Sequence, residues 1–302
     1  MIYLKDFQLL NESNPENYLA ISSICNCHTS DELYPFGLFN PNFTGQKLER
    51  IDFDDITILY GSNGSGKTTL LNIIAEKIEI FRSKEYVRTE AFEYYINNCN
   101  YDLCRKELPP NSKFLASDDI FEHILSVRKD NEAIKQLKQE KQIYSVQARF
   151  NSKEIYPDNI KIDMDNPEEI NKFREFMEAR KKTRRQFVRS RGGEMQRQYS
   201  NGENALMFFD KQIEMNALYL LDEPENSMSP RFQLELKTLI EESVRYKNCQ
   251  FVIATHSPFI LSLHDAKIYN LDASPVTVER WHELEYVRYY YDFFKTNEDL
   301  FN

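Results

Sequence analysis

Residues 61–69 read GSNGSGKTT, and this stretch constrains the fold more than any other part of the chain. It matches the pattern Gly-x-x-x-x-Gly-Lys-Ser/Thr at every fixed position. The apolar segment before it, within 52–60, predicts a strand, and the apolar spacing over 67–81 predicts a helix. A glycine-rich turn between a strand and a helix is the setting in which this pattern forms a phosphate-binding P-loop.

The physical basis of such a loop is local. The glycines permit a tight turn whose N–H groups point inward, and the helix N-terminus adds partial positive charge. We therefore expect Lys67 to contact the β- and γ-phosphates of ATP and the Thr68 hydroxyl to bind Mg²⁺. The residues expected to contact the nucleotide are Gly61, Ser62, Asn63, Gly64, Ser65, Gly66, Lys67, Thr68 and Thr69.

Length and charge narrow the class of protein. The 302 residues, 41% of them hydrophobic, can form one large core or a core with a satellite lobe. A net charge of −10 argues against a protein that coats nucleic acid over its whole surface. Five irregularly spaced cysteines argue against a disulfide framework and for a reducing compartment. We find no signal peptide and no apolar run long enough to span a bilayer, so we expect a cytoplasmic protein.

The order of apolar segments predicts an α/β fold with a mainly parallel core sheet. Strands are expected at 1–10, 217–221, 250–255 and 267–271, and a long helix at 230–246. Polar segments with helical spacing cover 120–148 and 168–190. We expect a single domain over 1–302, in which 1–116 and 198–302 form the nucleotide-binding core and 117–197 an inserted helical lobe. The N-terminal strands of the nucleotide-binding core are expected to be antiparallel.

Acidic and imidazole side chains follow two of the later strands. Asp222 and Glu223 end the run ALYLLDE, where one carboxylate can hold Mg²⁺ and the next can polarise an attacking water. A solvated acidic turn is the alternative. His256 follows the run FVIAT and can hydrogen-bond a γ-phosphate. We predict Glu223, His256 and Lys67 as catalytic residues, and Thr68 and Asp222 as ligands of Mg²⁺.

The run SNGEN at 200–204 opens a further predicted helix. Ser200 and Glu203 fit a capping box, which satisfies the first helical N–H groups. The order P-loop, helical segment, Ser-x-Gly-Glu, Asp-Glu and His resembles that of ABC-type ATPases. Glutamate after the glycine, and DEPEN at 222–226, are similar to the stand-alone bacterial members on the SMC and RecF side of that family, which often carry the label AAA.

That resemblance implies a shared reaction centre. In such ATPases the signature of one copy closes on the ATP of the other, in a head-to-tail homodimer. It therefore implies that Ser200, Asn201, Gly202 and Glu203 bind the nucleotide of a second copy, and that 226–229 form the loop that crosses between copies. The family glutamine expected near residue 117 is missing, and Ser117 or Asp118 is the candidate replacement as a metal ligand. The alternative is that an aspartate there caps the next helix.

Four further features leave alternatives open. The basic run at 180–197 suggests duplex DNA binding through Arg180, Lys181, Lys182, Arg184 and Arg185, or else a solvated helix face. Tyr34, Phe36 and Phe39 are candidates for stacking on adenine, but core packing is the favoured interpretation. A zinc site built from Cys25, Cys27, Cys99 and Cys104 is not favoured, because the Cys-x-Cys spacing is atypical. Core packing is also expected of the C-terminal aromatic stripe formed by Trp281, Tyr286, Tyr289, Tyr290, Phe293 and Phe294.

The sequence thus predicts a Mg²⁺-dependent ATPase that turns over ATP in a dimer. DNA repair or antiphage defence is the favoured role, with a separate effector protein as a candidate partner. The alternatives are the nucleotide-binding subunit of a membrane transporter and a slow ATP-dependent dimerisation switch.

Overall fold

A computed structural model of the chain describes residues 1–12, 14, 17, 34–39, 48–80, 89–126, 129, 132, 201–226 and 228–301. The chain divides into two compact units, Met1–Phe121 with Ser200–Asn302, and Glu122–Tyr199. The described residues belong almost entirely to the first unit. The inserted lobe expected over 117–197 lies mostly outside the described residues and stays a prediction.

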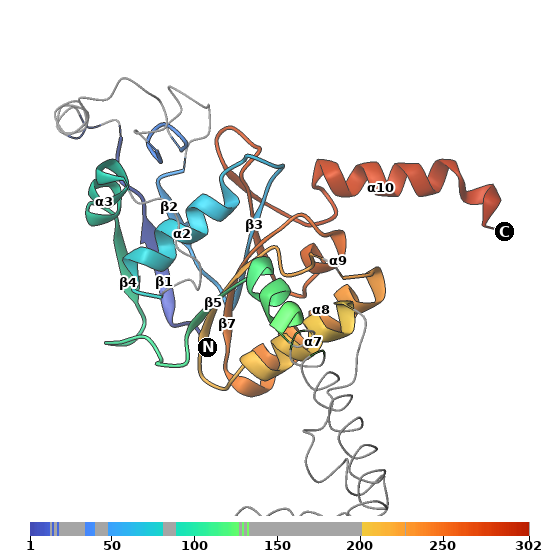
Figure 1. The fold of residues 1–302 in the computed structure, drawn as a ribbon. Helices are drawn as coiled ribbons and strands as arrows, with labels where there is room; N and C mark the ends of the chain where they lie inside the picture. The colour runs from blue at the N-terminus through green and yellow to red at the C-terminus, as the bar shows by residue number, and fades with distance from the viewer. Residues whose placement is uncertain are drawn as a thin grey trace, which may run out of the picture. The chain divides into compact units, whose positions relative to one another are not determined.

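The centre of the first unit is a six-stranded sheet (Figure 1). Its strands, in spatial order, are β5 (Lys113–Ala116), β6 (Leu218–Asp222), β7 (Gln250–Thr255), β3 (Ile56–Tyr60), β8 (Lys267–Asn270) and β9 (Thr277–Glu279). All neighbours pair in parallel except β8 and β9. Every residue of β3, β6 and β7 is buried, which explains why these strands are continuous apolar runs rather than alternating ones.

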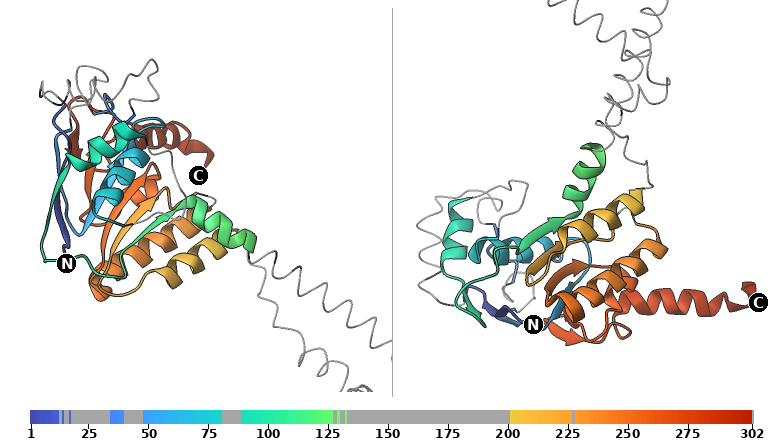
Figure 2. Two further views of the ribbon diagram at one scale, coloured as in Figure 1. Left: turned by 60° about the vertical axis from the view of Figure 1, so that its left-hand side comes forward. Right: turned by 90° about the horizontal axis from the view of Figure 1, so that it is seen from below.

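Helices cover both faces of this sheet (Figure 2). Leu220 and Val252 belong to the hydrophobic cluster that includes α2 (Lys67–Lys77), whereas their neighbours Leu221 and Ile253 point to the other face. On that side α8 (Pro230–Lys247) packs against β7 and against α7 (Asn201–Gln212). The helix expected over 67–81 ends earlier, because Glu79 adopts a left-handed conformation with φ 61°.

A second sheet contains β2 (Arg50–Asp52), β1 (Leu4–Gln8) and β4 (Asn100–Leu103), with both pairs antiparallel. Gln250 on β7 joins it to the core sheet, because its buried amide oxygen accepts the backbone N–H groups of Tyr3 and Leu4. The expected fold class is therefore confirmed in its mainly parallel core sheet and its antiparallel N-terminal strands.

Further helices are α3 (Glu90–Asn97), a helix over 117–126, α9 (Pro258–Leu261), α10 (Glu285–Thr296) and the short 3₁₀ helix η2 (Glu298–Leu300). None of the helices in the described part of the chain has the length and apolar content needed to span a bilayer.

One packing prediction is wrong. The C-terminal aromatic stripe does not enter the core, since each of its members is exposed: Trp281, Tyr286, Tyr289, Tyr290, Phe293 and Phe294. Within α10 only Val287 is buried. The spacing correctly indicated a helix with an apolar face, but spacing carries no information on what that face packs against.

Candidate functional site

Three of the predicted site segments meet because they follow adjacent strands. The P-loop follows β3, Asp222 ends β6, and Thr255 ends β7, which lies between them. The register pairs Asp222 with Ala254 and Tyr60 with Thr255, so the three strands end almost level. Parallel strands bind ligands at their carboxyl ends, and the predicted catalytic residues gather at that edge.

The P-loop has the backbone that its glycines were expected to provide. Gly64 and Gly66 have φ of 85° and 89°, a region that favours glycine. A Cβ on Gly66 would lie 2.9 Å from Leu38 Cδ2, so this position also lacks space for a side chain. The buried Lys67 ammonium donates to the carbonyl oxygens of Gly61 and Ser62, at 2.7 and 2.9 Å, and so lies inside the loop it was predicted to serve.

Asp272 holds the start of the loop, and sequence reasoning missed it. Its carboxylate accepts the Ser62 backbone N–H at 2.7 Å and the Ser62 hydroxyl at 2.9 Å. Asp272 follows β8, the neighbour of β3. Asp222 and His256 were predicted because polar residues that follow parallel strands tend to lie at the site. The same rule would have predicted Asp272.

The proposed Mg²⁺ ligands are in contact. The Thr68 hydroxyl donates to Asp222 Oδ1 at 2.9 Å. A hydroxyl and a carboxylate are hard oxygen ligands, which suit Mg²⁺. The described residues contain no cluster of three His, Cys, Asp or Glu side chains that could hold a metal by themselves. The donor set therefore fits an ion that takes its remaining ligands from phosphate and water, as Mg²⁺ does.

Ser117 and Asp118, the residues predicted to replace the missing glutamine, follow the strand next to the one that ends at Asp222. Ala116, the last residue of β5, pairs with Asp222, and Ser117 and Asp118 begin the helix that follows. Asp119 accepts the Ala116 backbone N–H at 2.8 Å, which is the reciprocal half of a capping box. An aspartate of this segment thus caps the helix, and metal binding by Ser117 or Asp118 stays a prediction.

Glu223 is held in a strained conformation. Its φ of 46° is unfavourable for a residue with a side chain, and such strain concentrates at functional sites. Its backbone N–H donates to Ala254 O at 2.9 Å, which ties the turn to β7. The Asn226 amide donates to Glu223 Oε2 at 3.0 Å, and Glu223 Oε1 lies 3.7 Å from His256 Nδ1.

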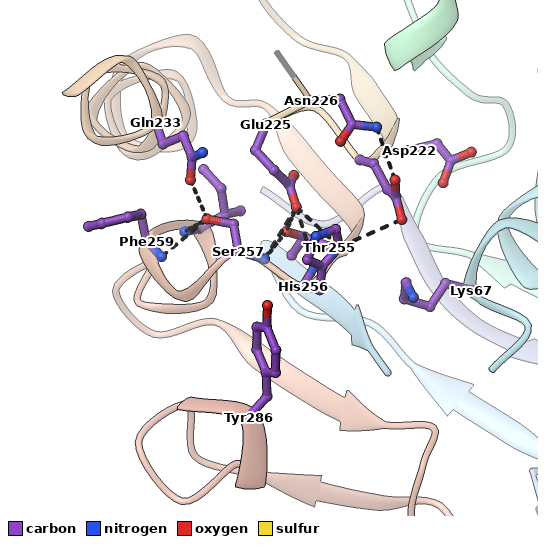
Figure 3. Close-up of polar contacts among 12 residues, drawn as sticks. Lys67, Asp222, Glu225, Asn226, Gln233, Thr255, His256, Ser257, Phe259 and Tyr286 are labelled. Atoms are coloured by element: carbon purple, nitrogen blue, oxygen red, sulfur yellow. Dashed lines mark hydrogen bonds and ion pairs between the residues drawn. The ribbon is translucent and has the colours of Figure 1, made fainter. Parts of the chain in front are cut away.

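Glu225 is a second residue that sequence reasoning missed. Its carboxylate is 5% exposed, and Oε1 accepts the Thr255 hydroxyl at 2.5 Å and the backbone N–H groups of His256 and Ser257 at 3.3 and 3.2 Å (Figure 3). Burial raises the pKa of this carboxyl, and the Thr255 hydroxyl, backbone N–H groups and His256 oppose that rise. A glutamate inside DEPEN gave no signal that it would turn inward.

Several buried polar atoms at this edge have no hydrogen-bond partner within the part of the chain that the structure describes. They are Ser65 Oγ in the P-loop, Glu225 Oε2 and His256 Nδ1. His256 Nδ1 lies 3.9 Å from Glu225 Oε1, beyond hydrogen-bond distance. Buried polar atoms are almost always paired, so three unpaired ones indicate a place for a polar ligand or ordered water. A triphosphate with its metal fits that requirement.

The predicted signature is described only from its second residue. Ser200 lies outside the described residues, while Asn201, Gly202 and Glu203 form the first turn of α7. A Cβ on Gly202 would meet the Phe232 ring of α8 at 2.5 Å, so glycine lets the two helices approach closely. The five basic residues of the 180–185 segment and the cysteines Cys25 and Cys27 also lie outside the described residues.

The three aromatic candidates for adenine stacking have different environments. Phe39 is buried in the core, and Phe36 packs edge-on against Tyr95, as core packing predicted. Tyr34 departs from that prediction, because it is exposed and its hydroxyl donates to Thr69 Oγ1 at 2.7 Å. It thus contacts the helix that follows the P-loop.

Comparison with known proteins decides the family. A family described as "AAA domain, putative AbiEii toxin, Type IV TA system" matches residues 109–262, just over half of the chain. The chain belongs to this family. The membership confirms the expected resemblance to ABC-type P-loop ATPases that carry the label AAA. A search of curated proteins gives no match to this AAA-domain chain.

Solved structures similar to the AAA-domain chain include SMC heads and an ATP-binding cassette. An SMC head domain of Pyrococcus furiosus, bound to the C-terminal domain of ScpA, is 14% identical with a TM-score of 0.43, over 100% of both chains. The SMC head of Thermotoga maritima is 12% identical with a TM-score of 0.39, over 92% of this chain and 98% of that one. A dimeric ATP-binding cassette bound to ADP and Pi is 14% identical with a TM-score of 0.35, over 80% and 92%.

Proposed function

We propose that this AAA-domain chain is a Mg²⁺-dependent ATPase whose reaction centre is completed by a second copy of the chain. One observation carries the ATPase part of the proposal. The Thr68–Asp222 hydrogen bond, the strained Glu223 and His256 lie at one edge of the sheet, directly beside the P-loop. These are the groups that phosphoryl transfer to water requires: a phosphate cradle, oxygen ligands for the metal, and a base beside the reacting phosphate.

The P-loop and its neighbouring residues would bind the nucleotide and its metal. The loop N–H groups and the start of α2 would hold the phosphates, while Lys67 would exchange its bonds to the Gly61 and Ser62 carbonyl oxygens for bonds to phosphate oxygens. Thr68 and Asp222 would hold Mg²⁺, which when bound neutralises charge that develops on the phosphates. Asp272 keeps the first turn of the loop in place through Ser62.

The water-activating group is Glu223. Asn226 fixes one of its carboxylate oxygens, which leaves the other directed at His256. A carboxylate held in this way can orient a water for in-line attack and accept its proton. His256, whose backbone is fixed by the buried Glu225, would donate a hydrogen bond to the phosphate.

Completion of the site by a second copy is supported by the order of the motifs. We propose that two copies bind head to tail, and that Ser200, Asn201, Gly202 and Glu203 of one copy contact the nucleotide held by the P-loop of the other. The P-loop of one copy and the start of α7 of the other would then share each ATP. Opening and closing of this dimer would be the output of the ATPase cycle.

We further propose that the output acts in DNA repair or antiphage defence. Duplex DNA would bind through Arg180, Lys181, Lys182, Arg184 and Arg185, and an effector protein would be separate. The toxin–antitoxin system in the family's description supports the defence role. Charge reversal of all five basic residues should abolish stimulation of the ATPase by duplex DNA and leave the basal rate unchanged. An unchanged stimulation would remove this part of the proposal.

Complementation between two inactive variants tests the shared site. Lys67→Ala and Ser200→Arg should each be inactive alone. Mixed in equal amounts, they should recover roughly a quarter of the wild-type rate of phosphate release, because half of the dimers are mixed and each of these has one intact site. The matched control mixes Lys67→Ala with Asp222→Asn. Both changes lie in the same half of the site, so no mixed dimer has an intact centre.

Two results would contradict the proposed shared site. If the Lys67→Ala and Ser200→Arg mixture stays inactive, and the wild-type rate per molecule does not depend on protein concentration, one copy suffices for turnover. If the control mixture recovers activity, Lys67 and Asp222 do not act in the same centre.

A further inference from the structure

Gln233, in the first turn of α8, connects two segments of the candidate site that lie apart in the sequence. Its amide nitrogen donates to Met228 O at 2.9 Å. Its amide oxygen accepts the Ser257 hydroxyl at 2.6 Å (Figure 3). Met228 belongs to the predicted crossing loop, 226–229, and Ser257 directly follows His256. One side chain thus bridges this loop and the segment that carries the histidine.

The orientation of the Gln233 amide follows from its partners. A carbonyl oxygen can only accept, so the end of the amide that faces Met228 O is the NH₂ group. The other end is then the amide oxygen, which needs a donor. The Ser257 oxygen accepts the N–H groups of Phe259 and Ile260, at 3.2 and 3.4 Å, which leaves its single proton for Gln233. A rotated amide would place two oxygen atoms face to face at Met228.

The direction of the His256 ring depends on the backbone that carries it. Its Nδ1 is buried and has no hydrogen-bond partner among the described residues. The ring of Tyr286 meets the imidazole edge-on, with centroids 6.4 Å apart. Glu225 accepts the backbone N–H groups of His256 and Ser257, and Gln233 holds the Ser257 side chain. The segment is therefore held at its backbone by one residue and at its side chain by the other.

The crossing loop also contacts the group proposed to activate water. Asn226 donates to Glu223 Oε2 at 3.0 Å, and the Met228 backbone N–H donates to Glu225 O at 2.9 Å. The loop is thus hydrogen-bonded to the proposed base, and Gln233 links it to the histidine segment as well.

Support of α8 alone is the other role that Gln233 could have. Its backbone N–H donates to Ser229 O at 3.0 Å, as in any helix, and the bond to Met228 would hold the chain that enters the helix. That role needs only the Met228 bond. The bond to Ser257 crosses 24 positions of the sequence and gives α8 no such support.

We propose that Gln233 is a positioning residue of the ATPase reaction, which makes the crossing loop and the His256 segment move as one unit. This rests on the function proposed above. Gln233 is not among the residues proposed to touch the nucleotide, so it acts through the placement of His256. When a second copy contacts the crossing loop, the displacement reaches the histidine through two hydrogen bonds. The loop therefore controls the hydrolysis step rather than ATP binding.

Gln233→Met in the full-length chain tests this, because it removes both hydrogen bonds at similar side-chain volume. Phosphate release should show a kcat at least about tenfold lower and a KM for ATP within about twofold of wild type, since misplaced groups lose rate rather than affinity. Lys237→Met is the matched control on α8. Lys237 donates at 3.0 Å to Ser262, at the C-terminal end of α9, whereas Ser257 lies at its N-terminal end. The kcat of this control should stay within about twofold of wild type.

Two further measurements separate positioning from a loss of stability. Ser257→Ala should also lower kcat, and its combination with Gln233→Met should lower kcat by less than the product of the two separate losses, because both remove the same contact. The imidazole ¹⁵N signals of His256, assigned with His256→Gln in nucleotide-free protein, should shift in Gln233→Met and stay in place in Lys237→Met. Circular dichroism establishes that the variants fold.

Four results would overturn the proposal: a kcat of Gln233→Met near that of wild type, unchanged His256 signals, independent losses in the double variant, or an equal loss in Lys237→Met. If Gln233→Met does not fold, Gln233→Glu replaces it. Its carboxylate can accept the Ser257 hydroxyl but cannot donate to Met228, so its kcat should fall as well. A wild type that releases no phosphate contradicts the proposed ATPase function instead, and the His256 signals then still decide whether Gln233 holds this segment.

Discussion

Glu225→Gln should change the dependence of stability on pH, because the native carboxyl is 5% exposed. Removal from water penalises the charged form and raises the pKa of Glu225, although the Thr255 hydroxyl and the nearby backbone N–H groups favour the anion. A glutamine side chain at this position would remain neutral at every pH. Its amide oxygen can replace Oε1 and accept the same three donors, so the main difference between the proteins is the charge.

The sign follows from the raised pKa. Below the unfolded pKa, about 4.3, Glu225 is protonated in both states and its contribution to stability is fully present. As the pH rises toward the folded pKa, unfolding releases a proton and stability is lost, with a slope that approaches about 1.4 kcal/mol per pH unit. Above the folded pKa the loss is complete. The free energy of unfolding of Glu225→Gln, minus that of the wild type, should therefore increase over this window.

Urea unfolding of both proteins between roughly pH 4 and pH 8 measures this difference. Glu235→Gln on α8 is the control for loss of a carboxylate at the surface, where Glu235 pairs with Arg231. If the advantage of Glu225→Gln stays constant or shrinks as the pH rises, the three donors stabilise the anion more than burial penalises it, and the reasoning is wrong.

Three further outcomes can be measured. Gly66→Ala should lower the free energy of unfolding by about 1–2 kcal/mol of left-handed backbone strain plus about 1–3 kcal/mol of crowding against Leu38. Gly64→Ala should show the backbone strain alone, because the space around that position is open. Equal losses of stability in the two variants would contradict the steric argument. Asp272→Ala removes two hydrogen bonds to Ser62, which should lower the free energy of unfolding by roughly 1–3 kcal/mol and weaken ATP binding in a calorimetric titration; unchanged affinity would show that Ser62 needs no support. Glu223→Gln should lower kcat about 10²–10⁴-fold while ATP still binds, and a kcat near that of the wild type would exclude Glu223 as the base.

Much of the site could be predicted because its residues follow buried parallel strands. Apolar runs identify such strands, and the residue after each run is placed at one edge of the sheet whatever the rest of the fold does. This is why the sequence could place the P-loop, Asp222, Glu223 and His256 at the edge of the sheet where the structure has them. Asp272 also follows a strand of this sheet, so the same rule would have predicted its position.

The contacts of Glu225 and Tyr34 could not be predicted from the sequence around each residue. Whether the Glu225 carboxylate turns outward to water or inward depends on β7, whose Thr255 lies 30 positions away in the chain and beside it in space. Tyr34 was assigned to the core as an aromatic residue in an apolar segment, yet its hydroxyl contacts Thr69 across 35 positions of the sequence. Contacts of this range leave no mark on the pattern around either residue.

The sequence by itself determined the glycine-rich loop at 61–69, the apolar strands that precede the motifs and the amphipathic nature of α10, because each depends on residue types at fixed short spacings. Only the tertiary structure decided that Glu225 fixes the backbone at His256 and that the aromatic face of α10 stays exposed. Periodicity shows that a face is apolar, but which surface covers it depends on packing between segments far apart in the chain.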